Sequence, residues 1–228
     1  MSESRMGTPA IYADLQRRLL TDGFEPGSKL MPSALHEEYG CSANTVRDVL
    51  LQLSKVGLVD FEIQRGFRAR QVSRQRRSEI ARFRVLLEQE GAVASMRLGG
   101  LEWEAALTAA HHRLLHIERQ IARTPDSVPF IGIWSDSELD FHRTLMSRCH
   151  LPPLQETFDN VYMQFRQQMV GLERNCVPAY FERIVEEHEA IVEAAVAKNE
   201  AALRAAIARH QARHIIDVDA SEAVSAAR

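Results

Sequence analysis

Ser42-Ala-Asn-Thr-Val-Arg-Asp-Val-Leu-Leu-Gln-Leu-Ser-Lys-Val-Gly57 has the pattern of one amphipathic helix. Its apolar residues recur at positions i, i+3, i+4 and i+7 and therefore form one stripe for burial: Val46, Val49, Leu50 and Leu53. Ser42 is a good N-cap and Gly57 a good stop. The opposite face offers polar side chains, among them Asn44 and Arg47. A plain surface helix and a helix that reads DNA share this pattern, so the neighbouring sequence has to separate the two.

Two shorter helical patterns precede this stretch. Apolar residues at helical spacing predict a first helix from about Thr8-Pro9 to about Gly23. A second helix is predicted from Pro32 to Tyr39. Only Gly40-Cys41 separates this helix from Ser42, which predicts a steep crossing between the two helices, as in a helix-turn-helix.

The pattern changes after Gly57. Alternation of apolar and acidic residues over residues 59–63 predicts a half-buried strand. Residues 68–72 return as a second strand, in which Arg68 and Arg70 share a face. A basic hairpin directly after a helix-turn-helix is typical of a wing that touches phosphates or a minor groove. A solvated hairpin face is the alternative interpretation of these arginines.

The 228-residue chain has the composition of a soluble globular protein, with 45% hydrophobic and 26% charged residues. Its first residues lack the apolar core of a signal peptide, and no stretch is long and apolar enough to cross a bilayer. We therefore expect a cytoplasmic location and no membrane partner. The three cysteines lie far apart and form no CxxC motif, so neither a disulfide framework nor a zinc ribbon is indicated.

The charge of the chain changes sign near Arg77. Residues 1–77 hold 12 Lys and Arg against 9 Asp and Glu, whereas the remaining residues hold 16 against 22. A basic module is therefore predicted to precede an acidic one. We expect the basic domain at residues 1–73 and a charged linker at residues 74–78. Such a charge run is also typical of a helix start, or of extra attraction for phosphates.

Beyond the linker, every long stretch has a helical pattern. Helices are predicted at about residues 78–99, 101–123, 130–148, 153–171, 179–197 and 200–220. Because no strand pattern interrupts them, residues 79–220 predict a helical bundle, and residues 221–228 form a C-terminal tail. The predicted fold class is mainly α, with an N-terminal winged helix-turn-helix, whose wing is a small β-hairpin, followed by an all-α bundle.

Four residues of the predicted bundle have the chemistry of a metal site. Glu138 and His142 are one helical turn apart, so both side chains leave the same face. His188 and His210 lie on two later helices. Three imidazoles and a carboxylate suit zinc, nickel, manganese or a similar divalent ion. The chain has 9 histidines, however, and a surface or packed core residue is the ordinary alternative for each.

The N-terminal motifs resemble the winged helix-turn-helix of GntR-type bacterial transcription regulators. The resemblance covers about residues 8–73 and rests on Ile11-Tyr-Ala-Asp-Leu15, Glu25-Pro-Gly-Ser-Lys-Leu30, Gly40-Cys-Ser-Ala-Asn-Thr-Val-Arg-Asp-Val-Leu50, Gly57-Leu-Val59 and Arg65-Gly66. It implies that operator DNA is contacted by the start of the recognition helix, by an arginine one turn into it and by the wing: Ser42, Ala43, Asn44, Thr45, Arg47, Arg65, Gly66 and Arg68. Ala43 stands where the family usually has arginine and cannot make a bidentate contact to guanine, so the operator sequence cannot be copied from relatives.

The C-terminal motifs resemble the FCD effector domain of FadR-type GntR regulators. The matching segments are Arg84-Val-Leu-Leu-Glu88, Glu138-Leu-Asp-Phe-His142, Glu187-His188 and Ala208-Arg-His210. The resemblance implies that a metal is bound by Glu138, His142, His188 and His210, and that Arg84 lies near a pocket for a small carboxylate. Glu138 stands where aspartate is usual, which leaves open both the metal and the role of Glu138 as a ligand.

Together the two resemblances imply a repressor that binds operator DNA as a homodimer. They also imply control by a small organic acid at a metal-containing pocket, with zinc the favoured ion and nickel or manganese as alternatives. A metal-dependent enzyme that uses the same three histidines and one glutamate is the opposing interpretation. The sequence shows no separate general base or nucleophile motif, and an enzyme would leave the winged module without a role.

Overall fold

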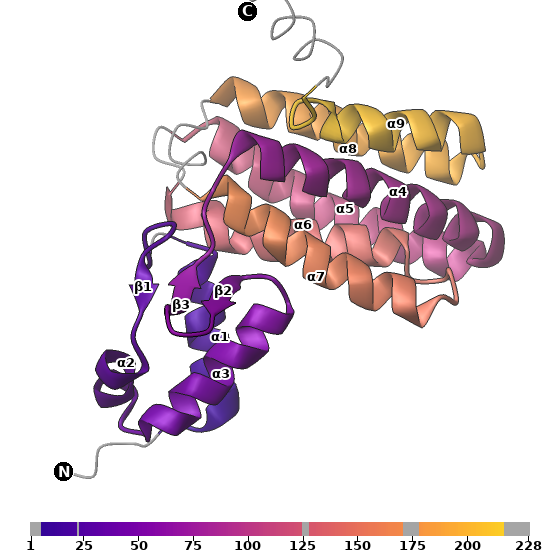
Figure 1. Cartoon of the computed structure of the whole chain (residues 1–228). Coiled ribbons are helices and arrows are strands. Elements are labelled where there is room, and N and C mark those ends of the chain that lie inside the picture. The colour runs from indigo at the N-terminus through magenta and orange to yellow at the C-terminus, as the bar shows by residue number, and fades with distance from the viewer. Residues whose placement is uncertain (1–5, 22, 125–127, 171–177, 217–228) are drawn as a thin grey trace, which may run out of the picture. The chain divides into compact units, whose positions relative to one another are not determined.

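A computed structural model describes residues 6–21, 23–124, 128–170 and 178–216. These residues are mainly helical and include one small antiparallel sheet, as the sequence predicted (Figure 1). They fall into two compact units. The first contains the residues up to Ser73 together with Met163 and the residues that follow it in the same helix, and the second contains residues 74–162 and those from 178 onward.

The first unit is a winged helix-turn-helix. Its elements are α1 (Thr8–Leu19), β1 (Lys29–Leu30), α2 (Pro32–Tyr39), α3 (Ala43–Lys55), β2 (Val59–Glu62) and β3 (Gly66–Ala69). The strands form one antiparallel sheet in the order β1-β3-β2, in which Phe61 pairs with Phe67. The apolar stripe of α3 is fully buried in a core shared with α1 and the sheet, and this core includes Ile11, Leu15, Val46, Val49, Leu50, Leu53 and Phe67.

Local features at both ends of α3 follow from its sequence. Gly40 ends α2 with a φ of 59°, a left-handed conformation that glycine adopts at little cost. Ser42 then caps α3, because its hydroxyl oxygen accepts a hydrogen bond from the backbone N–H of Thr45 at 3.1 Å. The helix ends at Lys55, and Gly57 turns the chain into β2 with a φ of 80°.

Three boundaries in this unit differ from the prediction. Helix α1 ends at Leu19 rather than near Gly23. The strand Lys29–Leu30 was not predicted, because two residues are too few to show a period, and only pairing with β3 defines it. The returning strand of the wing spans Gly66–Ala69 instead of residues 68–72, since the hairpin register already pairs Glu62 with Gly66.

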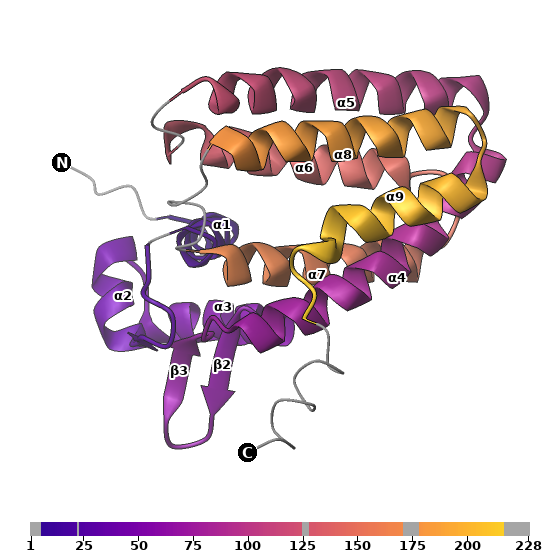
Figure 2. The ribbon, with the colours of Figure 1, turned by 90° about the horizontal axis from the view of Figure 1, so that it is seen from above.

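The second unit is a helical bundle, as predicted. Its elements are α4 (Arg74–Leu98), α5 (Gly100–Ala122), the short 3-10 helix η1 (Val128–Phe130), α6 (Ile131–Leu145), α7 (Pro152–Met169), α8 (Pro178–Val196) and α9 (Glu200–Ala212). Figure 2 shows α5, α8, α9 and α4 following one another across the bundle, and α5 packs on α6 as well. The core between these helices includes Trp103, Leu107, Leu114, Trp134, Phe141, Phe181 and Ile191.

Three helix ends in the bundle differ from the prediction, and one of them is the end of α6, at Leu145 rather than near residue 148. The predicted linker, residues 74–78, forms the start of α4, so its charge run is a helix start. Helix α9 ends at Ala212 rather than at residue 220. Both the predicted tail at residues 221–228 and the predicted end of the fourth helix at residue 171 lie outside the described residues. No helix in the described ranges is long and apolar enough to span a membrane.

Helix α7 contributes to both units. It begins in the second unit, whereas its residues from Met163 onward belong to the first. There the side-chain amide of Gln167 donates a hydrogen bond to the backbone oxygen of Leu58 at 2.8 Å, and Gln164 donates to Val56 at 3.2 Å. The side-chain amide of Gln168 likewise donates a hydrogen bond to the backbone oxygen of Gln71 at 3.0 Å.

Candidate metal centre and nucleic-acid interface

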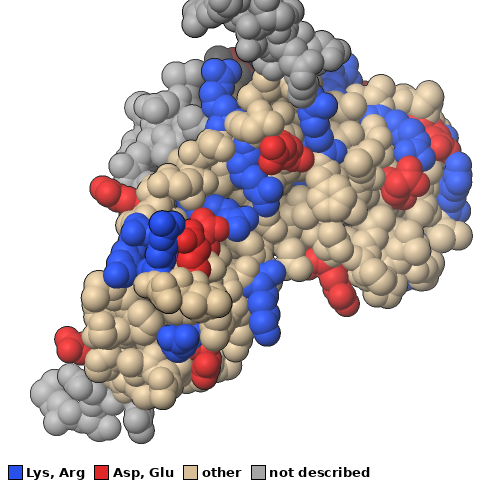
Figure 3. Space-filling view, viewed as in Figure 1, with Lys and Arg blue, Asp and Glu red and all other residues tan. Residues whose placement is uncertain are grey.

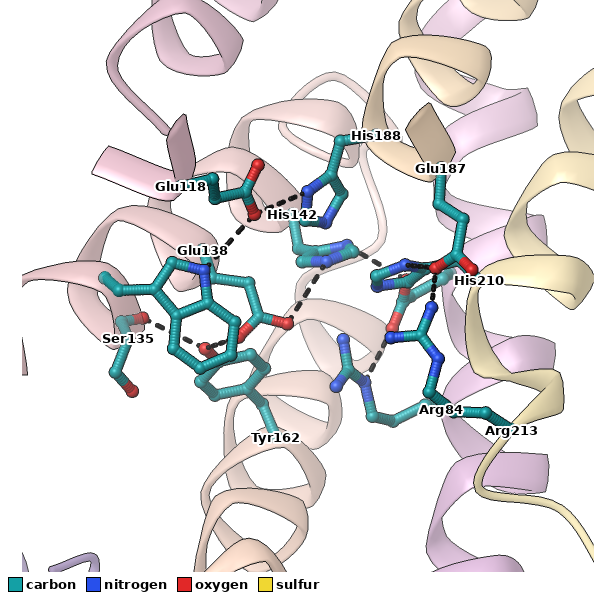
Figure 4. Close-up of polar contacts among 12 residues, drawn as sticks. Arg84, Glu118, Ser135, Glu138, His142, Tyr162, Glu187, His188, His210 and Arg213 are labelled. Carbon is teal, nitrogen blue, oxygen red and sulfur yellow. Dashed lines mark hydrogen bonds and ion pairs between the residues drawn. The ribbon is translucent and has the colours of Figure 1, made fainter. Parts of the chain in front are cut away.

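The bundle brings together four side chains that the sequence singled out as metal ligands. Glu138 and His142 come from α6, His188 from α8 and His210 from α9. One potential ligand atom from each lies within 4.8 Å of all the others, and all four residues are buried. Figure 4 shows the three imidazole rings facing one another beside the Glu138 carboxylate.

Each of the three imidazole rings has a carboxylate beside its Nδ1 atom. Nδ1 of His188 lies 3.0 Å from Glu118 Oε1, and Nδ1 of His210 lies 3.1 Å from Glu187 Oε2. Nδ1 of His142 lies 3.0 Å from Oε2 of Glu88. An ionised carboxylate can only accept a hydrogen bond, so the bonds at His188 and His210 favour the tautomer with hydrogen on Nδ1 and a lone pair on Nε2, whereas the contact at His142 is an ion-pair distance without hydrogen-bond geometry.

Two of the Nε2 atoms lack a hydrogen-bond partner among the described residues of the core. In the described part of the chain, Nε2 of both His142 and His188 is buried and makes no hydrogen bond. An unsatisfied polar atom inside a protein is costly, and such an atom calls for a ligand or ion. Nitrogen from imidazole and oxygen from carboxylate are the donors that zinc, nickel and manganese accept, so these residues fit a divalent transition metal.

Glu138 is oriented from α7. Its Oε2 atom accepts a hydrogen bond from the hydroxyl group of Tyr162 at 3.0 Å, while Oε1 lies 3.8 Å from Nε2 of His142. The same hydroxyl group lies 3.0 Å from the backbone oxygen of Ser135. The longer side chain of glutamate therefore still reaches the cluster, although aspartate was expected from the resemblance.

Arg84 lies fully buried beside the cluster. Its Nε atom donates a hydrogen bond to Oε1 of Glu88 at 2.7 Å, and its guanidinium carbon lies 5.0 Å from the centre of the Tyr162 ring. Burial raises the pKa of Glu88, but the nearby Arg84 and His142 outweigh that effect and lower it to about 2. Glu88 is therefore a carboxylate at neutral pH.

The histidines differ in their electrostatic surroundings. Burial lowers the pKa of His210 well below its ordinary value, and the neighbouring His188 and His142 lower it further. Burial also acts to lower the pKa of His188, but Glu118 outweighs it and the pKa is raised. Neutral His210 leaves Nε2 available as a lone-pair donor at physiological pH.

The charges around the cluster favour a cation. Four carboxylates surround the imidazoles, from Glu88, Glu118, Glu138 and Glu187, and two guanidinium groups face them, from Arg84 and Arg213. Because buried carboxylates are costly without positive partners, a divalent cation suits this site electrostatically as well as chemically.

Several residues of this site were not predicted as functional. Glu118 lies 70 positions from His188 in the sequence, and no motif joins the two. Tyr162 and Arg213 likewise approach the cluster only through the packing of α7 and of the end of α9. Glu88 and Glu187 stood within recognised motifs, and their motif positions were the one signal in the sequence that could have suggested a role.

In the first unit, the predicted DNA-contacting residues lie at the N-terminus of α3 and on the wing. The side chains of Ser42, Asn44 and Arg47 are exposed, whereas Ala43 and Thr45 are half-buried. The hydroxyl groups of Ser42 and Thr45 lie 2.9 Å apart, so both take part in the cap. This leaves Asn44 and Arg47 as the long polar side chains directed outward from the start of the helix.

Arg47 links the recognition helix to the wing. Its guanidinium carbon lies 6.0 Å from the ring centres of both Phe61 and Phe67, which stack on each other at 4.7 Å. Such contacts between a cation and an aromatic ring are attractive. They hold the arginine at the junction of α3 and the β2–β3 hairpin.

The basic residues of the wing have different partners. Arg65 pairs with Glu62 at 3.0 Å, and exposed Arg68 donates to the backbone oxygen of Gly27 at 3.0 Å. Arg70, predicted to share a face with Arg68, is half-buried and pairs with Asp60 at 2.6 Å. On the face drawn in Figure 3, basic and acidic side chains are interspersed. Arg65 and Arg68 are thus the exposed cations of the hairpin.

Comparison with known proteins places both units in one family. The FCD domain matches residues 79–213, and the gntR family of bacterial regulatory proteins matches residues 8–68. The chain belongs to the GntR family and carries an FCD domain. It is a DNA-binding transcriptional regulator and not an enzyme.

Similar proteins agree with this assignment. The GntR-family chain is 29% identical over 187 residues to the uncharacterized HTH-type transcriptional regulator BphR of Paraburkholderia xenovorans, covering 82% of this chain and 75% of the relative. It is 25% identical to the HTH-type transcriptional repressor GlaR of Escherichia coli, covering 78% and 79%. Its fold matches E. coli McbR/YncC with a TM-score of 0.73 at 21% identity, covering 90% and 93% of the two chains.

Proposed function

We propose that this GntR-family protein is a cytoplasmic repressor whose hold on operator DNA is released when a small organic acid binds at a divalent metal in the FCD domain. The observation that carries the proposal is the cluster of Glu138, His142, His188 and His210, with ligand atoms within 4.8 Å of one another. The name of the relative GlaR, a transcriptional repressor, supports repression over activation.

Zinc is the ion that we favour. Three imidazole nitrogens and one carboxylate oxygen are ordinary zinc ligands, and nickel and manganese accept the same donors. A metal held by these residues would offer any coordination position beyond the four protein ligands to a carboxylate oxygen of an organic acid. Arg84 lies next to the cluster and close enough to Glu138 for their charges to interact, so we assign it to the carboxylate of the effector.

Operator contact is assigned to the exposed start of α3 and to the wing. Asn44 and Arg47 project from the first turns of α3 toward base edges or phosphates, and Ser42, Ala43 and Thr45 bring the backbone close to the DNA. Arg65, Gly66 and Arg68 form the corresponding contacts of the hairpin, with phosphates or in the minor groove.

Regulation requires that binding of the effector and binding of operator DNA be linked. A homodimer presents two recognition helices, which have to meet major grooves about one helical turn apart. An effector that binds the two arrangements of the dimer with different affinity shifts the balance between them, and by linkage the effector and the operator change each other's affinity by the same factor. Release of the operator by the effector follows if the ligand prefers the arrangement that does not fit DNA.

The test has two stages. First, purified protein is dialysed against Zn²⁺ and its metal content is measured by elemental analysis, with His188→Ala as the comparison. The site is supported if wild-type protein holds about one zinc per chain and His188→Ala holds almost none. Second, small carboxylic acids are screened by thermal shift on the zinc-loaded protein, and those that stabilise it are added to a gel-shift assay. Wild-type protein without bound metal, or operator binding that no stabilising acid alters, would overturn the proposal.

A further inference from the structure

We infer that Glu88, Glu118 and Glu187 are positioning residues of the metal centre, each holding one ligating histidine across a contact between two helices. The inference rests on the proposed metal binding and adds to it the residues that fix the geometry of the ligands. In three places in the bundle, a glutamate carboxylate contacts both a donor group and the Nδ1 atom of a histidine.

The first of these chains runs from α6 through α5 to α8. The indole Nε1 of Trp134 donates a hydrogen bond to Oε1 of Glu118 at 3.2 Å, and the same oxygen lies 3.0 Å from Nδ1 of His188. Glu118 and His188 are both 0% exposed. Two donors on one carboxylate oxygen restrict its position, and the position of that oxygen in turn restricts rotation of the imidazole ring.

The second chain joins α4 to α6. Nε of Arg84 donates to Oε1 of Glu88 at 2.7 Å, and Oε2 of the same carboxylate lies 3.0 Å from Nδ1 of His142, as an ion-pair contact rather than an aligned hydrogen bond. Here the carboxylate bridges its two partners with separate oxygens. Because all three side chains are 0% exposed, water cannot replace either contact without entering the core.

The third chain joins α8 to α9. Oε2 of Glu187 lies 3.1 Å from Nδ1 of His210 and is also contacted by the guanidinium group of Arg213. Glu187 is 8% exposed, and it lines a surface groove together with Arg183 and Arg209. This chain is therefore the one that extends from the cluster to solvent.

The chemistry explains why a glutamate at each Nδ1 matters. A carboxylate that accepts from Nδ1 fixes both the tautomer and the orientation of the ring, and it makes Nε2 more basic toward a metal. Removing such a partner from a metal site lowers affinity by about 10- to 100-fold. Each of the three contacts also crosses from one helix to another, so the geometry of the ligands depends on how the helices of the bundle are packed.

Ordinary ion pairs that stabilise the bundle are the competing interpretation, and measurements of metal affinity separate the two. Zn²⁺ affinity is measured by competition with a chromophoric chelator for wild type, Glu118→Gln, Glu118→Ala and Glu187→Gln. Glu189→Gln is the matched control, because Glu189 lies on α8 next to His188 but forms an exposed pair with Arg119 at 3.2 Å. Circular dichroism of the metal-free proteins checks that each variant is folded.

We expect Glu118→Ala to lose about 10- to 100-fold in Zn²⁺ affinity. Glu118→Gln should lose less, because its amide oxygen still accepts a hydrogen bond from Nδ1. The control Glu189→Gln should bind Zn²⁺ as tightly as wild type. Glu187→Gln, at the edge of the bundle, provides the same test should Glu118 variants fail to fold. In NMR spectra of the zinc-loaded protein, the slowly exchanging Nδ1 proton of His188 should disappear in Glu118→Ala. Folded variants with unchanged affinity and an unchanged Nδ1 signal would overturn the inference alone, whereas wild-type protein without Zn²⁺ affinity would overturn the proposed function.

Discussion

The hydroxyl group of Tyr162 donates a hydrogen bond to Oε2 of Glu138 at 3.0 Å, and so a residue of α7 orients the one carboxylate among the four candidate ligands. This contact joins the candidate metal site to a helix whose last turns belong to the winged unit. Glu138 is also the position at which the chain departs from the usual aspartate, so the contact bears directly on whether this residue is a ligand.

Replacing Tyr162 with phenylalanine keeps the ring and removes the donor. If Glu138 is a ligand, we expect Zn²⁺ affinity to fall by about 10-fold, as for loss of other partners of ligating groups. Chelator competition measures the change, and Tyr12→Phe, in the first unit, serves as the control. Unchanged affinity in Tyr162→Phe together with unchanged affinity in Glu138→Gln would leave only the three histidines as ligands.

Metal removal should destabilise the FCD domain. A ligand present at 100 times its dissociation constant adds about 2.7 kcal/mol to the free energy of unfolding, which for a chain of this size corresponds to about 5–10 °C in Tm. Differential scanning fluorimetry before and after treatment with a chelator measures the shift. His188→Ala should show almost no response to the chelator, and a response equal to that of wild type would place the metal elsewhere.

Arg47→Ala tests the recognition helix. Loss of a base or phosphate contact should weaken binding by about 1–3 kcal/mol, or roughly 5- to 150-fold. A duplex selected by the wild-type protein from a random pool is the probe in a gel-shift assay. Arg17→Ala is the control, because this exposed arginine on α1 pairs with Asp14 at 2.5 Å. Equal affinity of wild type and Arg47→Ala would remove Arg47 from the interface.

The hydrogen bond between Tyr39 and Asp14 should be visible in a titration. Tyr39 donates to Asp14 Oδ2 at 2.7 Å, and this bond is the largest cause of the lowered pKa of that carboxyl group. A lowered pKa in the folded state contributes stability above the unfolded pKa, and this contribution is lost as the pH falls through the folded value. In Tyr39→Phe, an NMR titration should therefore show the pKa of Asp14 raised, and stability should fall less between neutral and acidic pH.

Gln167→Ala tests the contacts at the end of α7. The change removes the 2.8 Å bond to the backbone oxygen of Leu58, which keeps the longer bond from the backbone N–H of Arg70 at 3.4 Å. We expect a loss of about 0.5–1.5 kcal/mol in the free energy of unfolding of the winged unit, measured by urea denaturation. Exposed Gln75 bonds only within α4, to Glu79, so Gln75→Ala should change stability by no more than about 0.5 kcal/mol.

The sequence was most informative where periodicity and local chemistry act together. The stripe on α3, its cap at Ser42 and the stop at Gly57 each involve neighbours within a few positions, and all three predictions agree with the structure. Strand β1 has two residues and no period, so only its pairing with β3 reveals it. The charge run at residues 74–78 gave no basis for choosing between a linker and a helix start, and packing decided for the helix.

For the candidate metal site, the sequence indicated the four residues that cluster but not the residues that contact them. Glu138 and His142 are one turn apart, and a family motif marks each of the histidines. The partners of the histidine rings come from other helices, as Glu118 does for His188 over 70 positions. Nothing in the local sequence distinguishes such a glutamate from a solvated one, because its role depends on helix packing.

The guanidinium carbon of Arg47 lies 6.0 Å from the ring centres of both Phe61 and Phe67, so this side chain connects the start of the recognition helix to the wing. In DNA, the distance between a major groove and the next minor groove changes with curvature and groove width. If both parts contact the operator, a duplex whose curvature or groove width changes that distance should bind with a different affinity, which a comparison of duplexes with the same contacted bases and different flexibility would measure.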